Sequence, residues 1–229
     1  MNMAELVVAL DFDDALEALN MATSLRGQAP WVKVGLELFT VEGPRVLYAL
    51  KGLGYKVFLD LKLHDIPNTV GRATLACARA GADLVTLHLT GGERMCRAAV
   101  DAVRNLPNRP LVFGVTVLTS LADGELPGCR EPLSDFARTL ADDAACWGLD
   151  GVVCSGRECA GIKVRHPELR CLTPGIRLDQ GEADDQKRVM TPAQAVAAGS
   201  DFLVVGRPIT RASDPAAAAA AILMDMNRD

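Results

Sequence analysis

The chain lacks the patterns that mark several classes of metal-binding and disulfide-rich proteins. It has three histidines in 229 residues, in no spacing typical of a structural zinc site, and its seven cysteines include no Cys-x-x-Cys pair. We therefore predict no metal site, and buried, reduced thiols in a protein of the cytoplasm. Five cysteines lie in apolar or helical segments: Cys77, Cys96, Cys146, Cys154 and Cys171.

Charge and hydropathy exclude further classes. The net charge is −5 and there is no basic run, so nothing predicts binding to nucleic acid or to an anionic membrane surface. No window reaches the ~18 apolar residues of a membrane span. The N-terminal stretch MNMAELVVALDFDD has neither a cationic region nor a small-residue cleavage site, so it does not resemble a signal peptide. With 49% hydrophobic residues, the chain can bury a substantial core.

Short apolar runs rich in Val, Leu and Ile recur along the whole chain and alternate with segments of helical composition. The eight candidate strands are 6–10, 31–35, 56–62, 84–88, 111–118, 151–155, 170–176 and 202–206. Prolines stand where helices would begin, at Pro67, Pro132, Pro192 and Pro215. Glycines stand where helices would end, at Gly54, Gly81, Gly148 and Gly199.

A weak internal repeat supports this organisation. The stretches AGADLV (80–85), WGLDGVV (147–153) and AGSDFLVV (198–205) share Gly-x-Asp followed by an apolar run. Each predicts the end of a helix, a short polar turn and entry into a buried parallel strand. We therefore expect an α/β fold with one (β/α)8 TIM barrel over residues 1–229, and a doubly wound open sheet is the alternative.

The stretch FLDLKLHDIPNTV (58–70) has two different faces. Leucines at 59, 61 and 63 alternate with Asp60, Lys62 and His64, which is the period of a strand. In a parallel barrel, one side of a strand faces the helices and the other faces the interior, so neither side meets bulk water. The charged face is therefore expected to be buried.

Two more charges occupy equivalent places. Lys33 lies between two valines in the second predicted strand, and Asp11 ends the first. With Asp60 and Lys62 they form a neutral set at or near the carboxyl ends of three strands, the rim where barrel active sites are built. Neutrality matters because an unpaired buried charge costs several kcal/mol. A purely structural ion-pair network would give the same sequence pattern, but the place of these charges at the rim favours a role in an active site.

Two further motifs are expected at the same rim. TPGIR (173–177) follows the seventh predicted strand and GRPIT (206–210) follows the eighth, where many barrels bind phosphate. Arg177 and Arg207 offer charge and forked donors, and Gly206 allows backbone N–H groups to approach an oxyanion. The polar segment 178–190 between them is a candidate lid over the pocket.

These motifs together resemble the orotidine 5′-phosphate decarboxylase family in its bacterial form. The matching stretches, in family order, are VALD (8–11), VKVG (32–35), FLDLKLHDIPNTV (58–70), TVLTS (116–120), LDGVVCS (149–155), LTPGIR (172–177) and VVGRPIT (204–210). One departure is LHLTGG (87–92), where a small residue is expected after the histidine. The resemblance implies a carboxy-lyase that converts orotidine 5′-monophosphate (OMP) to UMP and CO2, the final step of pyrimidine biosynthesis.

The resemblance also implies catalytic roles. Lys62 would donate a proton, Asp60 would lie beside the substrate carboxylate, and Lys33 would anchor the charge network. Asp65, with Ile66 and Thr69, would reach into the site of a partner subunit and so make a homodimer part of the catalytic unit. The remaining implied contacts are Asp11 and Lys33 to the ribose hydroxyls, Thr119 and Ser120 to the pyrimidine, Arg177, Gly206 and Arg207 to the phosphate, and Gln186 of the lid to phosphate and base.

No motif for pyridoxal phosphate or thiamine diphosphate is present, so we expect a reaction without a cofactor. Three other interpretations stay open. A metal-dependent sugar-phosphate decarboxylase or synthase shares the Asp-x-Lys-x-x-Asp strand and would be inhibited by a chelator. A Schiff-base aldolase would use Lys33 or Lys62 as its nucleophile, although acidic neighbours argue against this. A barrel kept only as a binding module would have no need of the complete charge set.

Overall fold

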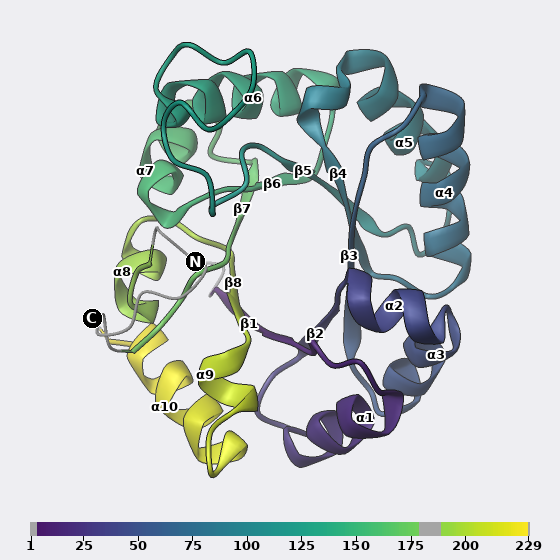
Figure 1. Cartoon of the computed structure of the whole chain (residues 1–229), viewed down its shortest axis with the longest axis vertical. Helices are drawn as coiled ribbons and strands as arrows, with labels where there is room; N and C mark the ends of the chain where they lie inside the picture. The colour runs from purple at the N-terminus through teal and green to yellow at the C-terminus, as the bar shows by residue number, and fades with distance from the viewer. Residues whose placement is uncertain (1–3, 179–188, 229) are drawn as a thin grey trace.

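Eight parallel strands in chain order close into a barrel, and helices surround it (Figure 1). This computed structural model describes residues 4–178 and 189–228. The strands are β1 (Glu5–Ala9), β2 (Trp31–Val34), β3 (Lys56–Leu63), β4 (Leu84–His88), β5 (Leu111–Val115), β6 (Gly151–Val153), β7 (Arg170–Thr173) and β8 (Phe202–Val205). Because β8 pairs with β1, the sheet has no edge. The predicted (β/α)8 barrel is confirmed, and an open sheet is excluded.

The helices fill the connections between the strands. They are α1 (Ala15–Ser24), α2 (Leu36–Glu42), α3 (Arg45–Gly52), α4 (Pro67–Arg79), η1 (Leu89–Gly91), α5 (Glu93–Val103), α6 (Leu133–Trp147), α7 (Gly156–Arg165), α8 (Pro192–Ala197), α9 (Arg207–Thr210) and α10 (Pro215–Met226). None of these helices is both long and apolar enough to cross a bilayer within the described ranges.

The helix starts and ends follow the predicted punctuation. Three of the prolines are the first residues of α4, α8 and α10, and Pro132 directly precedes α6. The four glycines predicted to end helices all have positive φ, and Gly148 caps α6 in the left-handed region at φ 83°. That region is costly for residues with a Cβ, which explains the choice of glycine there.

Two strands end three residues earlier than predicted, the largest such differences among the eight. The fifth was expected over 111–118 and the seventh over 170–176, but β5 ends at Val115 and β7 at Thr173. The apolar residues that follow are buried for another reason: Val117 and Ile176 line a cavity instead of continuing the sheet. Pro174 also has no N–H to offer to a ladder.

The repeated aspartate ties each of three strands to the strand before it. Its backbone N–H donates to a carbonyl of the preceding strand, and its carboxylate accepts the N–H of that same residue. The three closed pairs are Asp83 with Val57, Asp150 with Val112, and Asp201 with Cys171. Each carboxylate also pairs with a cation, from Lys51, Arg109 and Lys163 respectively. The repeat is therefore structural and fixes the amino-terminal end of the barrel.

Aromatic side chains fill the barrel interior. The Phe202 ring meets the Trp31 ring edge-on at 5.4 Å and the Phe113 ring at 5.9 Å, within an apolar cluster that also contains Phe58. A Cβ at Gly151 would collide with the Phe113 ring, so this inward-facing position must be glycine. Above this filled interior, a cavity lies towards the carboxyl ends of the strands.

Four of the five cysteines expected to be buried are buried, and Cys146 is the exception. The buried residues of α6 are Leu133, Ala137, Leu140, Ala141 and Ala144, which form one face of the helix. Cys146 lies two residues beyond Ala144, on a different face, and it is exposed.

Candidate active site

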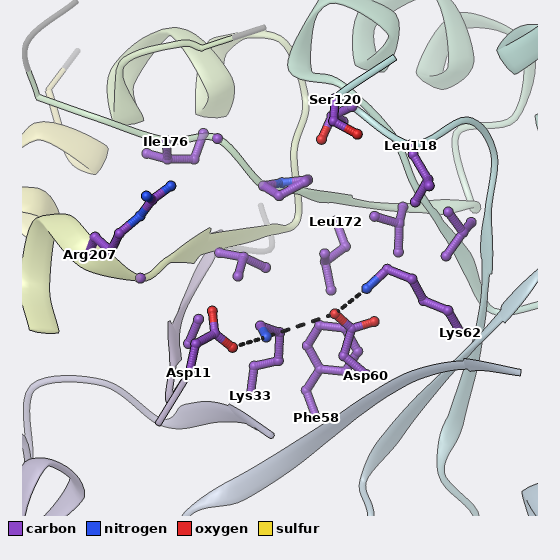
Figure 2. A pocket seen from close by; sticks show the side chains of 18 of the residues that line it. Asp11, Lys33, Phe58, Asp60, Lys62, Leu118, Ser120, Leu172, Ile176 and Arg207 are labelled. Carbon is purple, nitrogen blue, oxygen red and sulfur yellow. Dashed lines mark hydrogen bonds and ion pairs between the residues drawn. The ribbon is translucent and has the colours of Figure 1, made fainter. Parts of the chain in front are cut away.

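A cavity of about 300 Å³ lies at the carboxyl ends of the strands. Its lining comes from segments nearly two hundred positions apart in the sequence, and Figure 2 shows their side chains converging on it. The structure brings together nine of the predicted site residues here: Asp11, Lys33, Asp60, Lys62, Thr119, Ser120, Arg177, Gly206 and Arg207.

The side chains of Asp11, Lys33, Asp60 and Lys62 form a series of alternating charge, called the charge chain below (Figure 2). Lys33 Nζ lies 2.7 Å from Asp11 Oδ1 and 3.9 Å from Asp60 Oδ2. Lys62 Nζ lies 2.7 Å from the same Asp60 Oδ2. Lys33 and Asp60 are only 9% and 8% exposed. The formal charges of these four side chains sum to zero, and each buried charge has a partner of opposite sign.

Asp60 lies in the middle of the charge chain and stays ionised. Burial alone would raise the pKa of its carboxyl, but the ammonium groups of Lys33 and Lys62 outweigh burial and lower the pKa below its ordinary value. Hydrogen bonds from Lys62 and Thr86 act in the same direction. The site therefore holds a carboxylate between two cations.

A bulge in β3 positions Lys62. Leu59 pairs with Val85 and Leu63 with Leu87, so β3 advances four residues while β4 advances two. Residues 60–62 therefore face Thr86 alone. Lys62 has φ 50° and is the only described residue other than glycine with positive φ. A lysine in the left-handed region costs about 1–3 kcal/mol, and such strain persists where the surroundings enforce it.

Thr86 holds the bulge together and was not predicted from the sequence. Its hydroxyl donates to Asp60 Oδ1 at 2.8 Å and accepts from the Lys62 N–H at 3.1 Å. One buried side chain thus orients the carboxylate and satisfies the backbone of the strained lysine. The sequence signal for it is weak, because a threonine inside a strand such as LVTLH is common.

Two histidines lie close to this cluster. The rings of His64 and His88 are 5.4 Å apart. Burial, with the charges of His64 and Lys62, lowers the pKa of His88 below its ordinary value of 6.5, so it is neutral at neutral pH. His64 is exposed and follows the end of β3, so the expected alternation on the charged face does not extend to it.

Gly35 makes room for the first ion pair of the chain. A Cβ at this position would lie 3.0 Å from Lys33 Nζ and 3.1 Å from Asp11 Oδ1. Those contacts are tighter than most real Cβ contacts, and they would push the ammonium and carboxylate apart. The glycine of the motif VKVG is therefore a condition for the charge chain.

The two ends of the cavity differ in character. Figure 2 shows Arg207 on one side and Lys62 across the pocket from it. Arg177 also lines the cavity, from the segment after β7, and its neighbour Ile176 lies on the Arg207 side in Figure 2. The lining includes apolar side chains, of which Phe58 and Leu172 lie between the two ends in Figure 2. Such a site can hold an anion at one end and a reacting group beside Lys62 and Asp60 at the other.

Three predicted residues lie outside the cavity lining, and a fourth is not among the described residues. Asp65, Ile66 and Thr69 follow β3 at the start of α4 and are exposed, outside the cavity lining. Asp65 Oδ1 accepts the N–H of the next residue, and Ile66 is 66% exposed. Gln186 lies outside the described residues, as does most of the candidate lid 178–190.

Known proteins resemble this chain over almost its full length. The model of the "Orotidine 5'-phosphate decarboxylase / HUMPS family" matches residues 4–222. Orotidine 5'-phosphate decarboxylase of Nitratidesulfovibrio vulgaris strain DP4 is 60% identical over 98% of each chain. The enzyme of Lawsonia intracellularis is 52% identical over 93% of this chain and 95% of its own. The crystal structure of the Lactobacillus acidophilus enzyme has a TM-score of 0.85 and 39% identity, covering 98% of this chain and 100% of that chain.

Proposed function

The chain belongs to the orotidine 5'-phosphate decarboxylase / HUMPS family, and from this premise we propose how its rim carries out the reaction. The activity is decarboxylation of OMP to UMP and CO2, in pyrimidine biosynthesis. The observation that supports the mechanism is the chain of alternating charge, in which Lys62 Nζ lies 2.7 Å from Asp60 Oδ2 at the edge of the cavity.

Loss of CO2 leaves an electron pair at C6 of the pyrimidine, where no carbonyl is placed to accept it. Lys62 supplies a positive charge that faces this carbon and then donates its proton to it. An interaction that strengthens as negative charge develops lowers the barrier, whereas equal binding of ground and transition states does not. The hydrogen bond that the Lys62 N–H donates to Thr86 fixes the strained backbone of Lys62, and the ion pair with Asp60 orients its ammonium before substrate arrives.

Asp60 has two roles in this proposal. It orients Lys62 through their ion pair, and it lies beside the substrate carboxylate, whose departure removes a repulsion between like charges. Lys33 compensates Asp60 from the other side and, with Asp11, holds the ribose hydroxyls. The Schiff-base alternative requires a neutral amine, whereas both lysines form ion pairs at 2.7 Å.

The phosphate binds at the end of the cavity opposite Lys62. Arg177 and Arg207 supply charge-assisted donors, and Gly206 lets the backbone approach the oxyanion. Thr119 and Ser120 contact the pyrimidine from the loop after β5. Binding energy from the phosphate, which is remote from C6, can offset the cost of removing water from the charged site.

A homodimer completes the site. Asp65, Ile66 and Thr69 are exposed in one chain and close to Lys62 in sequence, as expected for residues that contact a partner. Ile66 presents a large apolar side chain to the surface at 66% exposure. In a two-fold dimer, each subunit would place Asp65 in its partner's pocket, where this second carboxylate would act on Lys62.

The reaction is tested by adding OMP to the purified protein and following the loss of its absorbance, with UMP identified as the product. We expect full turnover in excess chelator. Turnover that disappears with the chelator and returns with a divalent cation would instead support the metal-dependent alternative. No UMP under either condition would contradict the proposed reaction.

The shared site is tested with hybrid dimers of Lys62→Ala and Asp65→Ala. Each variant alone is expected to be nearly inactive. A mixed dimer carries both changes in one site and none in the other, so random re-association restores ~25% of wild-type activity. If mixing restores nothing although mixed dimers form, Asp65 acts within its own subunit or not at all.

A further inference from the structure

Three buried cysteines meet behind the wall of the active site. Cys154 follows β6, Cys159 lies in the first half of α7, and Cys171 lies in β7. Each has an exposure of 0%, and the three Sγ atoms lie within 4.8 Å of one another. Within the described ranges this is the only group of three potential metal-ligand side chains. None of the three belongs to the catalytic cavity.

The cluster results from the barrel itself. β6 pairs with β7, with Val152 beside Cys171 and Val153 beside Leu172. Val153 and Leu172 face the cavity, so their neighbours Cys154 and Cys171 point to the opposite side, where α7 covers the sheet. The sequence does not reveal this, because the three cysteines are separated by five and twelve positions and form no metal-binding motif.

The spacing of the sulfurs suits coordination of one ion. A Zn–S bond of about 2.3 Å places the sulfurs of a trigonal or tetrahedral site roughly 3.8–4.0 Å apart. Cys154 Sγ and Cys159 Sγ are 3.6 Å apart, and the widest separation in the group is below 4.8 Å. Shifts of under about 1 Å would therefore bring all three to bonding distance, a change within reach of ordinary side-chain rotation.

The chemistry of the three side chains points in the same direction. Cysteine sulfurs are the ligands that soft cations prefer, and they bind such ions as thiolates. The three sulfurs are buried together and are already in contact, with Cys159 Sγ 3.6 Å from Cys154 Sγ.

We propose that Cys154, Cys159 and Cys171 form a buried site for one soft, thiophilic divalent cation, held by three thiolate sulfurs. The cysteines bind as thiolates, so binding of the ion displaces their thiol protons. The hydroxyl of Thr173, 3.4 Å from Cys159 Sγ, is the nearest candidate for a fourth ligand. The site is independent of the decarboxylation chemistry, and its presence or absence leaves the proposed function unaffected.

The test uses Cd²⁺ as the probe and the full-length Cys129→Ser/Cys146→Ser protein, because these two cysteines are the ones that are not buried. The reduced protein is incubated with Cd²⁺, freed of excess ion, and analysed for bound metal and for X-ray absorption at the cadmium edge. We expect one Cd²⁺ per chain, with three sulfur neighbours. Fewer than three sulfurs, or no retained ion, would overturn the proposal.

Variants in this background assign the ligands. Cys159→Ala is expected to weaken Cd²⁺ binding by at least about 100-fold, since loss of even an outer-shell partner of a ligand costs 10–100-fold. Cys96→Ala is the matched control, because it removes a buried thiol outside the cluster and should change nothing. Equal binding by both variants would contradict the assignment. Should Cys159→Ala fail to fold, Cys171→Ala takes its place, and the sulfur count of the unsubstituted cluster decides independently.

Discussion

The interior and the rim of this barrel are built from the same strands but contain opposite kinds of side chain. In the interior, the rings of Trp31 and Phe113 each pack edge-on against Phe202 within an apolar cluster. At the rim, a few residues further along the strands, Lys33 and Lys62 both lie within ion-pair distance of Asp60. Side chains that stabilise the fold and side chains that line the site are therefore separated along the length of each strand.

Phe58 marks the boundary between the two regions. It packs in the apolar interior cluster and also lines the cavity, and Asp60 follows it by two positions on the same strand. Apolar burial contributes about 25 cal/mol per Å², whereas a buried charge is tolerated only when it is paired. The apolar interior therefore stabilises the folded barrel, and this stabilisation offsets the free-energy cost of the buried charges and the strained backbone at the rim. Substitutions in the two regions should have separable effects.

The largest effect is expected at the rim, from Lys62→Ala. We predict that turnover falls at least ~10⁴-fold, because the variant loses both the proton donor and the charge that faces C6. UMP binding should remain largely intact, since the product has no carboxylate and its phosphate is proposed to bind at the far end. Steady-state kinetics and calorimetry with UMP measure the two quantities. Substantial residual turnover would refute the assigned role.

The next largest effect is expected in the interior, from Phe113→Ala. Phe113 is 0% exposed and contacts the Phe202 ring, so we predict a loss of about 3–5 kcal/mol in the free energy of unfolding. The kcat of the protein that remains folded should change little. Urea denaturation and kinetics at low temperature test both expectations.

Leu16→Ala serves as the control for that experiment, because Leu16 is 66% exposed and should cost under about 0.5 kcal/mol. If Phe113→Ala lowers kcat in the folded protein as strongly as a rim substitution does, the separation between interior and rim is not real.

Thr86→Val should affect both stability and activity, and we expect its effects to be smaller than those of the two substitutions above. It keeps the shape but removes the donor to Asp60 Oδ1 and the acceptor for the Lys62 N–H. We predict a stability loss of about 1–3 kcal/mol together with a lower kcat. Thr86→Ser retains the hydroxyl and should recover most of the activity. Equal activity in both variants would show that the bulge does not depend on this hydroxyl.

The smallest effect is the pH dependence of stability that arises from Asp60. Its pKa in the folded protein lies below the ordinary value of 3.8, so the unfolded chain binds the proton more readily. The stabilisation is complete above pH 3.8 and is lost as the pH falls through the lower folded pKa. The difference in unfolding free energy between wild type and Asp60→Asn should therefore shrink in acid. A difference that grows as the pH falls would contradict the assignment.

Much of this molecule could be predicted from its sequence because the relevant signals are local. Apolar runs located all eight strands, and the charges of Lys33, Asp60 and Lys62 could be placed at the rim from their positions in those runs. The strands β5 and β7, which were each predicted three residues too long at their ends, show the limit of that signal. Burial against a cavity and burial in a sheet produce the same apolar pattern.

The features that were missed depend on which strands become neighbours. The bulge exists because residues 60–62 of β3 face only Thr86 of β4, a relationship that plain alternation of leucine and charge does not contain. The left-handed backbone of Lys62 follows from the same pairing. Asp65 and Ile66 are exposed, and their contact with a partner's pocket stays a prediction, as does the role of Gln186, which lies outside the described residues.

The most direct test of the central claim asks whether the charge at position 62 is what matters. A Lys62→Cys variant, in the Cys129→Ser/Cys146→Ser background, is alkylated either to an aminoethyl thioether, which restores an ammonium, or to an uncharged propyl thioether of similar length. The account predicts that kcat for OMP recovers by orders of magnitude with the ammonium adduct and stays at the level of the unmodified variant with the neutral one. Equal recovery with both adducts would contradict it.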